Sequence, residues 1–230
     1  MNMFCYQCQE TSKGTGCALV GVCGKTPEVS NIQDLLLFVD RGVAVYNNEL
    51  RKQGKASTVA DKYIVDAMFI SITNANFDFE AIKEKVKEGL KLKSGLAATL
   101  GTPNIILPDE CTWNGDESEF MDKALEVGVL RTKDEDIRSL KELVHYGLKG
   151  MAAYAEHAYN LDKTDDEIFT FIQKALADIT REDISVNELV ALALETGKYG
   201  VQVMALLDAA NTGRFGNPEI TQVNIGVGKN

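Results

Sequence analysis

Four of the five cysteines in this chain of 230 residues lie within its first 23 positions, at Cys5, Cys8, Cys17 and Cys23. Their spacing is C-x2-C-x8-C-x5-C, in the run CYQCQETSKGTGCALVGVC. Thiolates bind zinc and iron–sulfur clusters, so four of them in one short segment form a ligand set for a soft metal centre. The segment therefore predicts a metal site at the start of the chain.

The spacing favours an iron–sulfur cluster over zinc, and zinc over disulfides. A structural zinc site usually pairs one C-x2-C with a second close pair, whereas Cys17 and Cys23 are separated by five residues. Glycines in the same stretch allow backbone N–H groups to approach inorganic sulfide and stabilise its charge. Spacing alone does not distinguish a 4Fe–4S from a 2Fe–2S cluster.

The remaining candidates for chemistry carry weaker signals. Cys111 has no cysteine or histidine close to it in sequence, which is typical of a buried apolar side chain, and we assign it no role. Glu142 and His145 form an E-x-x-H pair, but a di-iron bundle needs a second copy, and Tyr154 stands three residues before His157. A di-iron site is thus the weakest of the metal hypotheses, and both histidines are interpreted as structural or surface residues.

Composition limits the class of protein. The formal net charge of −10 argues against binding nucleic acid or an anionic membrane through a basic patch. The N-terminus lacks the basic and apolar regions of a secretory signal, and the longest apolar run near it is too short to cross a bilayer. We therefore expect a cytoplasmic protein, in which clustered cysteines are metal ligands rather than disulfides.

Beyond the cysteines the pattern is helical, which predicts an all-α fold of two three-helix-type bundles. Capping boxes are expected at Ser30–Gln33, Thr132–Glu135, Thr164–Glu167 and Ser185–Glu188. Apolar periodicity predicts helices over residues 31–53, 58–73, 78 to about 94, 117–127, 133–159, 165–179 and 186–210. The glycines and prolines of 95–115 predict a loop without helical structure.

These elements divide the chain into five parts. We expect a cysteine-rich loop at 1–29, a first bundle at 30–95, a connector at 96–115, a second bundle at 116–217 and a strand-like tail at 218–230. The tail is expected to be extended because Ile220, Thr221, Val223, Ile225 and Val227 are β-branched. A strand needs a partner, and no other convincing strand is present in the sequence.

Both ends of the chain resemble the hybrid-cluster proteins, also called prismane proteins or hydroxylamine reductases. The similar residues are MFCYQCQETSKGTGCALVGVCGKTPEVSNIQDLLLFV at the start and TQVNIGVGKN at the end. The helical middle fits the pair of three-helix bundles of that family but is less specific. The second run resembles the family's passage from its helical domain into an α/β domain.

The resemblance implies a function for the cysteines. In family members with this compact spacing, the four N-terminal cysteines bind a 4Fe–4S cluster, and Cys5, Cys8, Cys17 and Cys23 match them position by position. The cluster passes electrons from a redox donor protein to a second, hybrid iron–sulfur–oxygen cluster. At that second cluster the family reduces hydroxylamine, and the resemblance extends this expectation to nitric oxide.

The sequence departs from the family at the second centre. The hybrid cluster is held by a histidine, two glutamates and four cysteines of later domains, and Cys111 is the only further cysteine here. We therefore expect an N-terminal fragment that carries the electron-entry cluster and does not itself reduce hydroxylamine. The alternative is a helical interaction domain with structural zinc.

Overall fold

The computed structural model describes residues 2–223 and residue 226, and this part of the chain is all-α, as predicted. It contains three short 3-10 helices, η1 (Ser12–Gly14), η2 (Glu117–Glu119) and η3 (Val129–Arg131). Its eight α-helices are α1 (Pro27–Lys52), α2 (Thr58–Ile70), α3 (Phe79–Leu100), α4 (Asp109–Thr112), α5 (Phe120–Val127), α6 (Glu135–Tyr159), α7 (Asp166–Asp178) and α8 (Val186–Phe215).

The expected C-terminal strand is not confirmed. Residues 216–223 follow α8 without forming a strand, and the remainder of the predicted tail, apart from residue 226, lies outside the described residues. Among the described residues, the β-structure consists of one isolated bridge between Cys5 and Cys17.

Helix α1 lies at the centre of the fold. It is buried over most of its circumference, from Ile32 to Leu50, and it packs against α2, α3, α4, α5 and α7. A helix that is buried on nearly every side must be surrounded by other elements. One continuous hydrophobic core therefore runs from α1–α3 into α6–α8.

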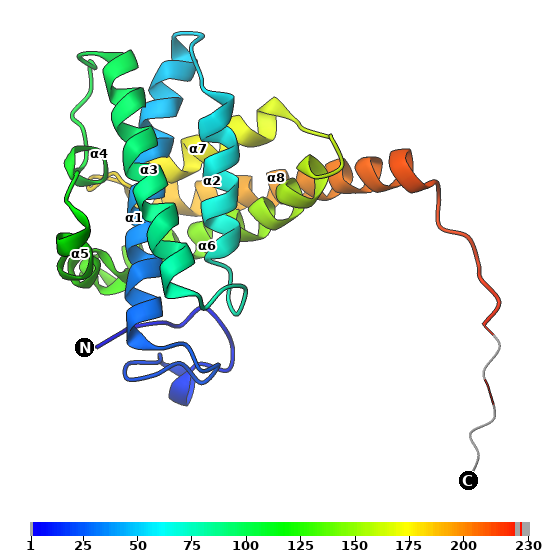
Figure 1. Cartoon of the computed structure of the whole chain (residues 1–230), viewed down its shortest axis with the longest axis horizontal. Coiled ribbons are helices and arrows are strands. Elements are labelled where there is room, and N and C mark those ends of the chain that lie inside the picture. The colour runs from blue at the N-terminus through cyan, green and yellow to red at the C-terminus, as the bar shows by residue number, and fades with distance from the viewer. Residues whose placement is uncertain (1, 224–225, 227–230) are drawn as a thin grey trace.

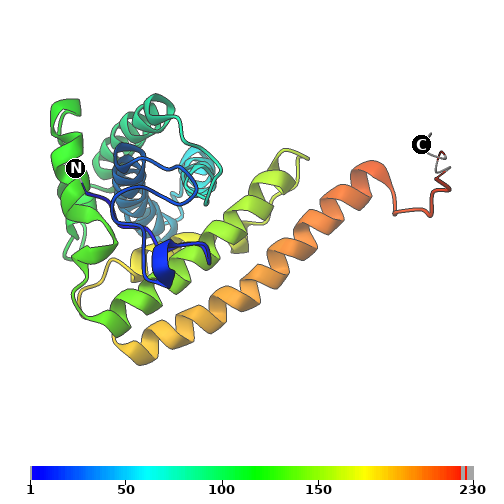
Figure 2. The ribbon, with the colours of Figure 1, turned by 90° about the horizontal axis from the view of Figure 1, so that it is seen from below.

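Two sets of helices cross each other. In Figure 1, α1, α2 and α3 stand side by side, and α6, α7 and α8 run across them. Figure 2 shows α6 and α8 as a long pair that extends beyond the rest of the molecule. The arrangement contains the six long helices expected from periodicity, and the division into two separate bundles joined at 96–115 stays a prediction.

Most of the helix caps differ from the predicted ones. The capping box at Ser185–Glu188 is confirmed, with the Ser185 hydroxyl and the Glu188 carboxylate each bonded to the other residue's backbone N–H. The other three expected boxes are not the caps used, because α1 begins at Pro27 after Thr26 and the α6 and α7 caps are Asp134 and Asp165. A carboxylate caps as well as a hydroxyl, and proline is favourable at the first helical position.

Helix α3 is longer than predicted. It continues past Gly95, and the next residue, Leu96, is buried and adds to the core. The helix ends at Gly101, whose φ of 72° suits a left-handed C-terminal stop. The segment 95–115, predicted to lack helices, thus contains the end of α3 and the short α4.

Candidate metal centre

The cysteine loop folds back on itself below the N-terminal end of α1 (Figure 1). Cys5 and Cys17 exchange two backbone hydrogen bonds, with N···O distances of 3.1 and 2.8 Å. Helix η1 makes the turn between them, and Lys13 and Gly14 adopt positive φ angles of 56° and 69° to close it. The loop therefore brings the first and third predicted ligands next to each other.

Cys17 has the clearest thiolate environment. Its side chain is buried, and its Sγ accepts a hydrogen bond from the Ser12 backbone N–H at 3.4 Å. The Thr11 hydroxyl lies 3.6 Å from the same sulfur. Hydrogen bonds from the backbone N–H groups of Ser12 and Val22 lower the pKa of the Cys17 thiol. Such donors stabilise a negatively charged sulfur, which is the form that binds metals.

Cys5 lies near two buried lysines. Burial raises the pKa of its thiol, while the backbone N–H of Gln7 and the charges of Lys25 and Lys149 lower it. Lys149 is only 2% exposed and donates a hydrogen bond to the Ser71 carbonyl at 3.1 Å. A buried cation is costly without a negative partner, so these lysines make the inner side of the loop suitable for an anionic centre.

The other two cysteines are more accessible. Cys8 is half-buried and Cys23 is exposed. Cys23 lies in a turn in which the Gly24 N–H donates to the Gly21 carbonyl at 2.8 Å. A Cβ atom at Gly21 would lie 3.0 Å from the Cys23 sulfur. A side chain at position 21 would therefore crowd the Cys23 sulfur.

The four predicted ligands share one loop, but their sulfurs are not assembled. All four thiols are free, and within residues 2–223 no three side chains of His, Cys, Asp or Glu form a group that could hold a metal ion. The residue types, the N–H donors on Cys17 and the lysines behind Cys5 fit an iron–sulfur cluster. The ligand set itself stays a prediction.

Polar contacts fasten the loop to the helices. Lys25 is buried and its Nζ donates to Gln33 Oε1 at 2.7 Å, and the Gln33 amide donates to the Asn76 carbonyl at 2.9 Å. The Asn31 amide donates to the Asn2 carbonyl at 3.1 Å. Because these partners come from α1 and the α2–α3 loop, the helical core holds the loop in place.

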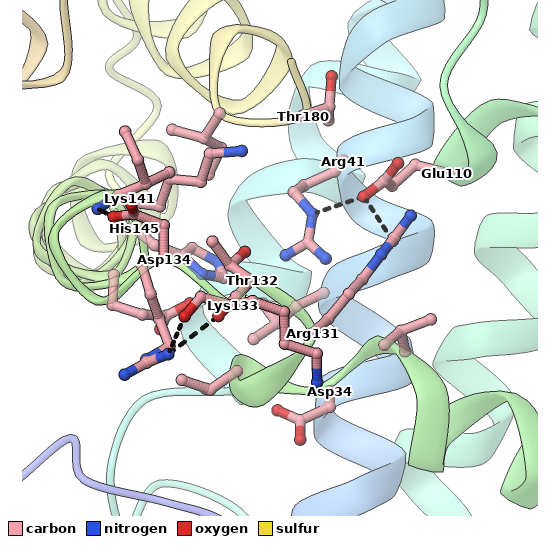
Figure 3. A pocket seen from close by; sticks show the side chains of 18 of the residues that line it. Asp34, Arg41, Glu110, Arg131, Thr132, Lys133, Asp134, Lys141, His145 and Thr180 are labelled. Carbon is pink, nitrogen blue, oxygen red and sulfur yellow. Dashed lines mark hydrogen bonds and ion pairs between the residues drawn. The ribbon is translucent and has the colours of Figure 1, made fainter. Parts of the chain in front are cut away.

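A cavity of about 320 Å³ adjoins the loop, with Gln7 in its wall. Figure 3 shows its charged lining, which includes residues of α1, α4, η3 and α6. Burial raises the pKa of Asp34 to about 7, and burial also raises the pKa of Glu142 and lowers that of His145 well below its ordinary value. His145 is therefore uncharged at neutral pH, Asp34 titrates close to neutral pH, and Glu142 holds its proton more tightly than an exposed carboxyl group does.

Sequence reasoning missed most of this polar interior. His145 was interpreted as structural or surface and is buried in the cavity wall, while His157 packs edge-on against Phe69 with ring centroids 5.7 Å apart. Asp34 stands in a run of apolar residues, where nothing in its neighbours marks it as functional. A signal was available on α6, because Glu142, His145 and Lys149 are spaced i, i+3 and i+7 and so share one face.

Cys111 agrees with its interpretation as a buried apolar side chain. It is 1% exposed, its sulfur lies 3.8 Å from the Gly42 carbonyl, and burial raises the pKa of the thiol to about 12. None of the helices in the described part of the chain is both long enough and apolar enough to cross a membrane.

Comparison with known proteins gives the family. The model of the Prismane/CO dehydrogenase family matches residues 3–230. A protein named hydroxylamine reductase from Bacteroides fragilis strain YCH46 is 66% identical over 230 residues, which is 100% of this chain and 42% of that protein. Proteins of the same name from Desulfitobacterium hafniense strain DSM 10664 and Thermoanaerobacter pseudethanolicus are 53% and 50% identical over 100% of this chain and 43% of their own lengths. The chain thus spans less than half the length of the curated relatives it matches.

Proposed function

Because the chain belongs to the Prismane/CO dehydrogenase family, we propose that its N-terminal loop binds a 4Fe–4S cluster through Cys5, Cys8, Cys17 and Cys23. The single observation that carries this proposal is the environment of Cys17, whose sulfur accepts a backbone N–H at 3.4 Å and whose pKa is lowered by N–H donors. When bound, such a cluster accepts and releases one electron at a time.

The residues of the chain would set the properties of that centre. The Ser12 and Val22 N–H groups stabilise negative charge on the Cys17 sulfur. Lys25 and Lys149 stabilise it at Cys5 from the buried side. Hydrogen bonds to sulfur, burial and nearby charge are the principal means by which a protein adjusts the potential of an iron–sulfur cluster.

The activity of the whole protein is a further proposal. Its relatives are named hydroxylamine reductase, and that reaction converts hydroxylamine, two electrons and two protons into ammonia and water. We propose that this chain is the electron-entry part of such an enzyme, located in the cytoplasm and reduced by a redox donor protein. The exposed loop residues Leu19 (77% exposed), Val20 and Val22 adjoin Cys17 and Cys23 and suit contact with that donor.

Metal analysis of matched variants tests the proposal. The chain is purified without oxygen, and iron and acid-labile sulfide are measured for wild type, Cys17→Ala and Cys111→Ala. We expect iron and sulfide in the wild type and in Cys111→Ala, and their loss in Cys17→Ala. Of the two substituted cysteines, only Cys17 is a proposed ligand in the loop. The cluster-loaded chain alone should show no hydroxylamine reduction, since it lacks the later ligands.

Two outcomes would refute it. Zinc without sulfide, in protein produced with adequate iron, would favour the alternative of a structural zinc domain. Iron without sulfide that survives loss of the loop cysteines would favour a di-iron centre.

A further inference from the structure

The cavity beside the cysteine loop contains an unusual excess of unpaired donors. Of the basic side chains in its wall, Arg41 is largely buried, and its one ion pair among the described residues joins Nε to a Glu110 carboxylate oxygen at 3.6 Å. Figure 3 shows the two terminal nitrogens of Arg41 directed away from Glu110, toward the middle of the cavity. Both nitrogens are therefore placed to bind something else.

His145 points to the same conclusion independently. Its side chain is 3% exposed, and its Nε2 atom has no hydrogen-bond partner within the described part of the chain. A buried polar atom without a partner costs free energy, so such atoms usually bind a ligand or water. The location of His145 in the cavity wall makes the cavity the source of that partner.

Lys141 adds a second cation at the same place. Its Nζ donates to the Arg181 carbonyl at 2.8 Å, which leaves further N–H donors free. Burial lowers the pKa of this ammonium group, and the positive charge of Arg41 lowers it further. Two cations crowded together are stabilised by an anion between them.

The wall also contains acidic residues, of which Asp134 caps α6 by accepting from the Ile137 N–H at 2.9 Å and Glu182 acts on Lys141. Glu110 is already shared by Arg41 and Arg131, whose Nη1 lies 3.2 Å from it. Burial raises the pKa of Asp34 to about 7 and also raises the pKa of Glu142, so both carboxyl groups hold their protons more tightly than exposed ones do. A guanidinium with two free nitrogens is well suited to hold an oxyanion in a fork of two hydrogen bonds.

We propose that the cavity is a binding site for a small oxyanion, such as phosphate or the phosphate group of a larger ligand, held by Arg41, Lys141 and His145. Arg41 supplies the paired donors, Lys141 supplies charge, and the neutral His145 ring donates from Nε2. The site is separate from the cysteine ligands, so it does not depend on the cluster proposed above.

Titration with inorganic phosphate tests the site. Binding to the chain is measured by calorimetry at constant ionic strength, with chloride as the replaced anion. Arg41→Gln should weaken phosphate binding by about tenfold or more, as expected for loss of a charge-assisted hydrogen bond. Arg214→Gln is the matched control, because Arg214 is exposed on α8 with a single long ion pair to Asp162 at 3.8 Å. It should bind phosphate as the wild type does.

A second variant covers the risk that Arg41→Gln does not fold, which circular dichroism will show. His145→Phe keeps a planar aromatic ring but removes the Nε2 donor, and it should also weaken binding. A parallel titration with glycerol phosphate tells whether the site prefers a free phosphate or the phosphate group of a larger ligand. Binding of either one more tightly than chloride supports the site. Phosphate that binds no better than chloride, equal weakening by Arg214→Gln, or unchanged binding in both cavity variants would overturn the proposal.

Discussion

Asp34 provides a quantitative test of the polar interior. Burial raises the pKa of its carboxyl group from 3.8 to about 7, with repulsion from Glu142 as the next cause and Lys149 acting in the opposite direction. The folded chain therefore holds the proton more tightly than the unfolded chain. Its contribution to stability is fully present below about pH 4 and is lost as the pH rises toward 7.

The size of the effect follows from the shift. Each unit of pKa corresponds to about 1.36 kcal/mol, so a shift of about three units gives at most about 4 kcal/mol. Asp34 lines a cavity and is not fully closed off from water, and its carboxyl group interacts with Glu142. Contact with water and the interaction with Glu142 both reduce the pH-dependent contribution of Asp34 to the free energy of unfolding, which we expect to be about 2–4 kcal/mol.

The substitution Asp34→Asn removes the titration while keeping the shape of the side chain. The free energy of unfolding is measured by urea denaturation at pH values between 4 and 8 for wild type and variant. The variant should gain stability relative to wild type as the pH rises from 4 to 7, and the difference should then level off. Because the two proteins are compared at each pH, the contributions of groups that titrate in both of them cancel in the difference.

Asp208→Asn is the control, because Asp208 is exposed on α8. Its difference from wild type should be nearly independent of pH. If Asp34→Asn shows the same flat profile, or loses stability relative to wild type as the pH rises, then burial of Asp34 does not raise its pKa and the argument is wrong.

Two further predictions concern packing and buried hydrogen bonds. A Cβ atom at Gly89 would clash with the Tyr63 hydroxyl oxygen, so Gly89→Ala should destabilise the folded chain by about 1–3 kcal/mol in thermal melts. At Gly95 an added Cβ atom would meet open space, so Gly95→Ala should instead stabilise α3 by about 0.5–1 kcal/mol in the same melts. Asn47 joins α1 to α7 through a hydrogen bond of 2.9 Å to Gln173. Asn47→Ala should lower the free energy of unfolding in urea by about 1–3 kcal/mol, and an unchanged value would show that the pair adds nothing.

Local periodicity was sufficient to predict the helices but not their ends. The apolar stripe that predicts α1 depends only on spacing along one element, and so it can be read from the sequence. The continuation of α3 to Leu100 depends on what Gly95 and Leu96 face in the folded chain, and a glycine signals a stop only where a turn is available. Tertiary packing decided this case, as it often does for helix propensities.

The cysteine loop could be recognised for a similar reason, since its four thiols lie within one short segment. The donors that act on them could not, because the Ser12 N–H reaches Cys17 only after the turn at Lys13 and Gly14 has formed. Lys149 is 144 positions beyond Cys5 and affects it only through the packing of α6. Such long-range electrostatic partners leave no pattern in the nearby sequence.

The two helices that border the cavity and the loop explain why these buried charges occur together. Asp34 and Arg41 are seven residues apart on α1, and so are Glu142 and Lys149 on α6, so each pair lies on one face of its helix. An ordinary core would place leucine or valine at such positions, because burying ionisable groups destabilises a fold unless they are paired. The structure keeps a continuous apolar core elsewhere on the same helices. The ionisable residues of α1 and α6 that face the loop and the cavity are therefore best explained by what those two sites bind, whereas buried polar residues elsewhere, such as Asn47, bond to other parts of the fold.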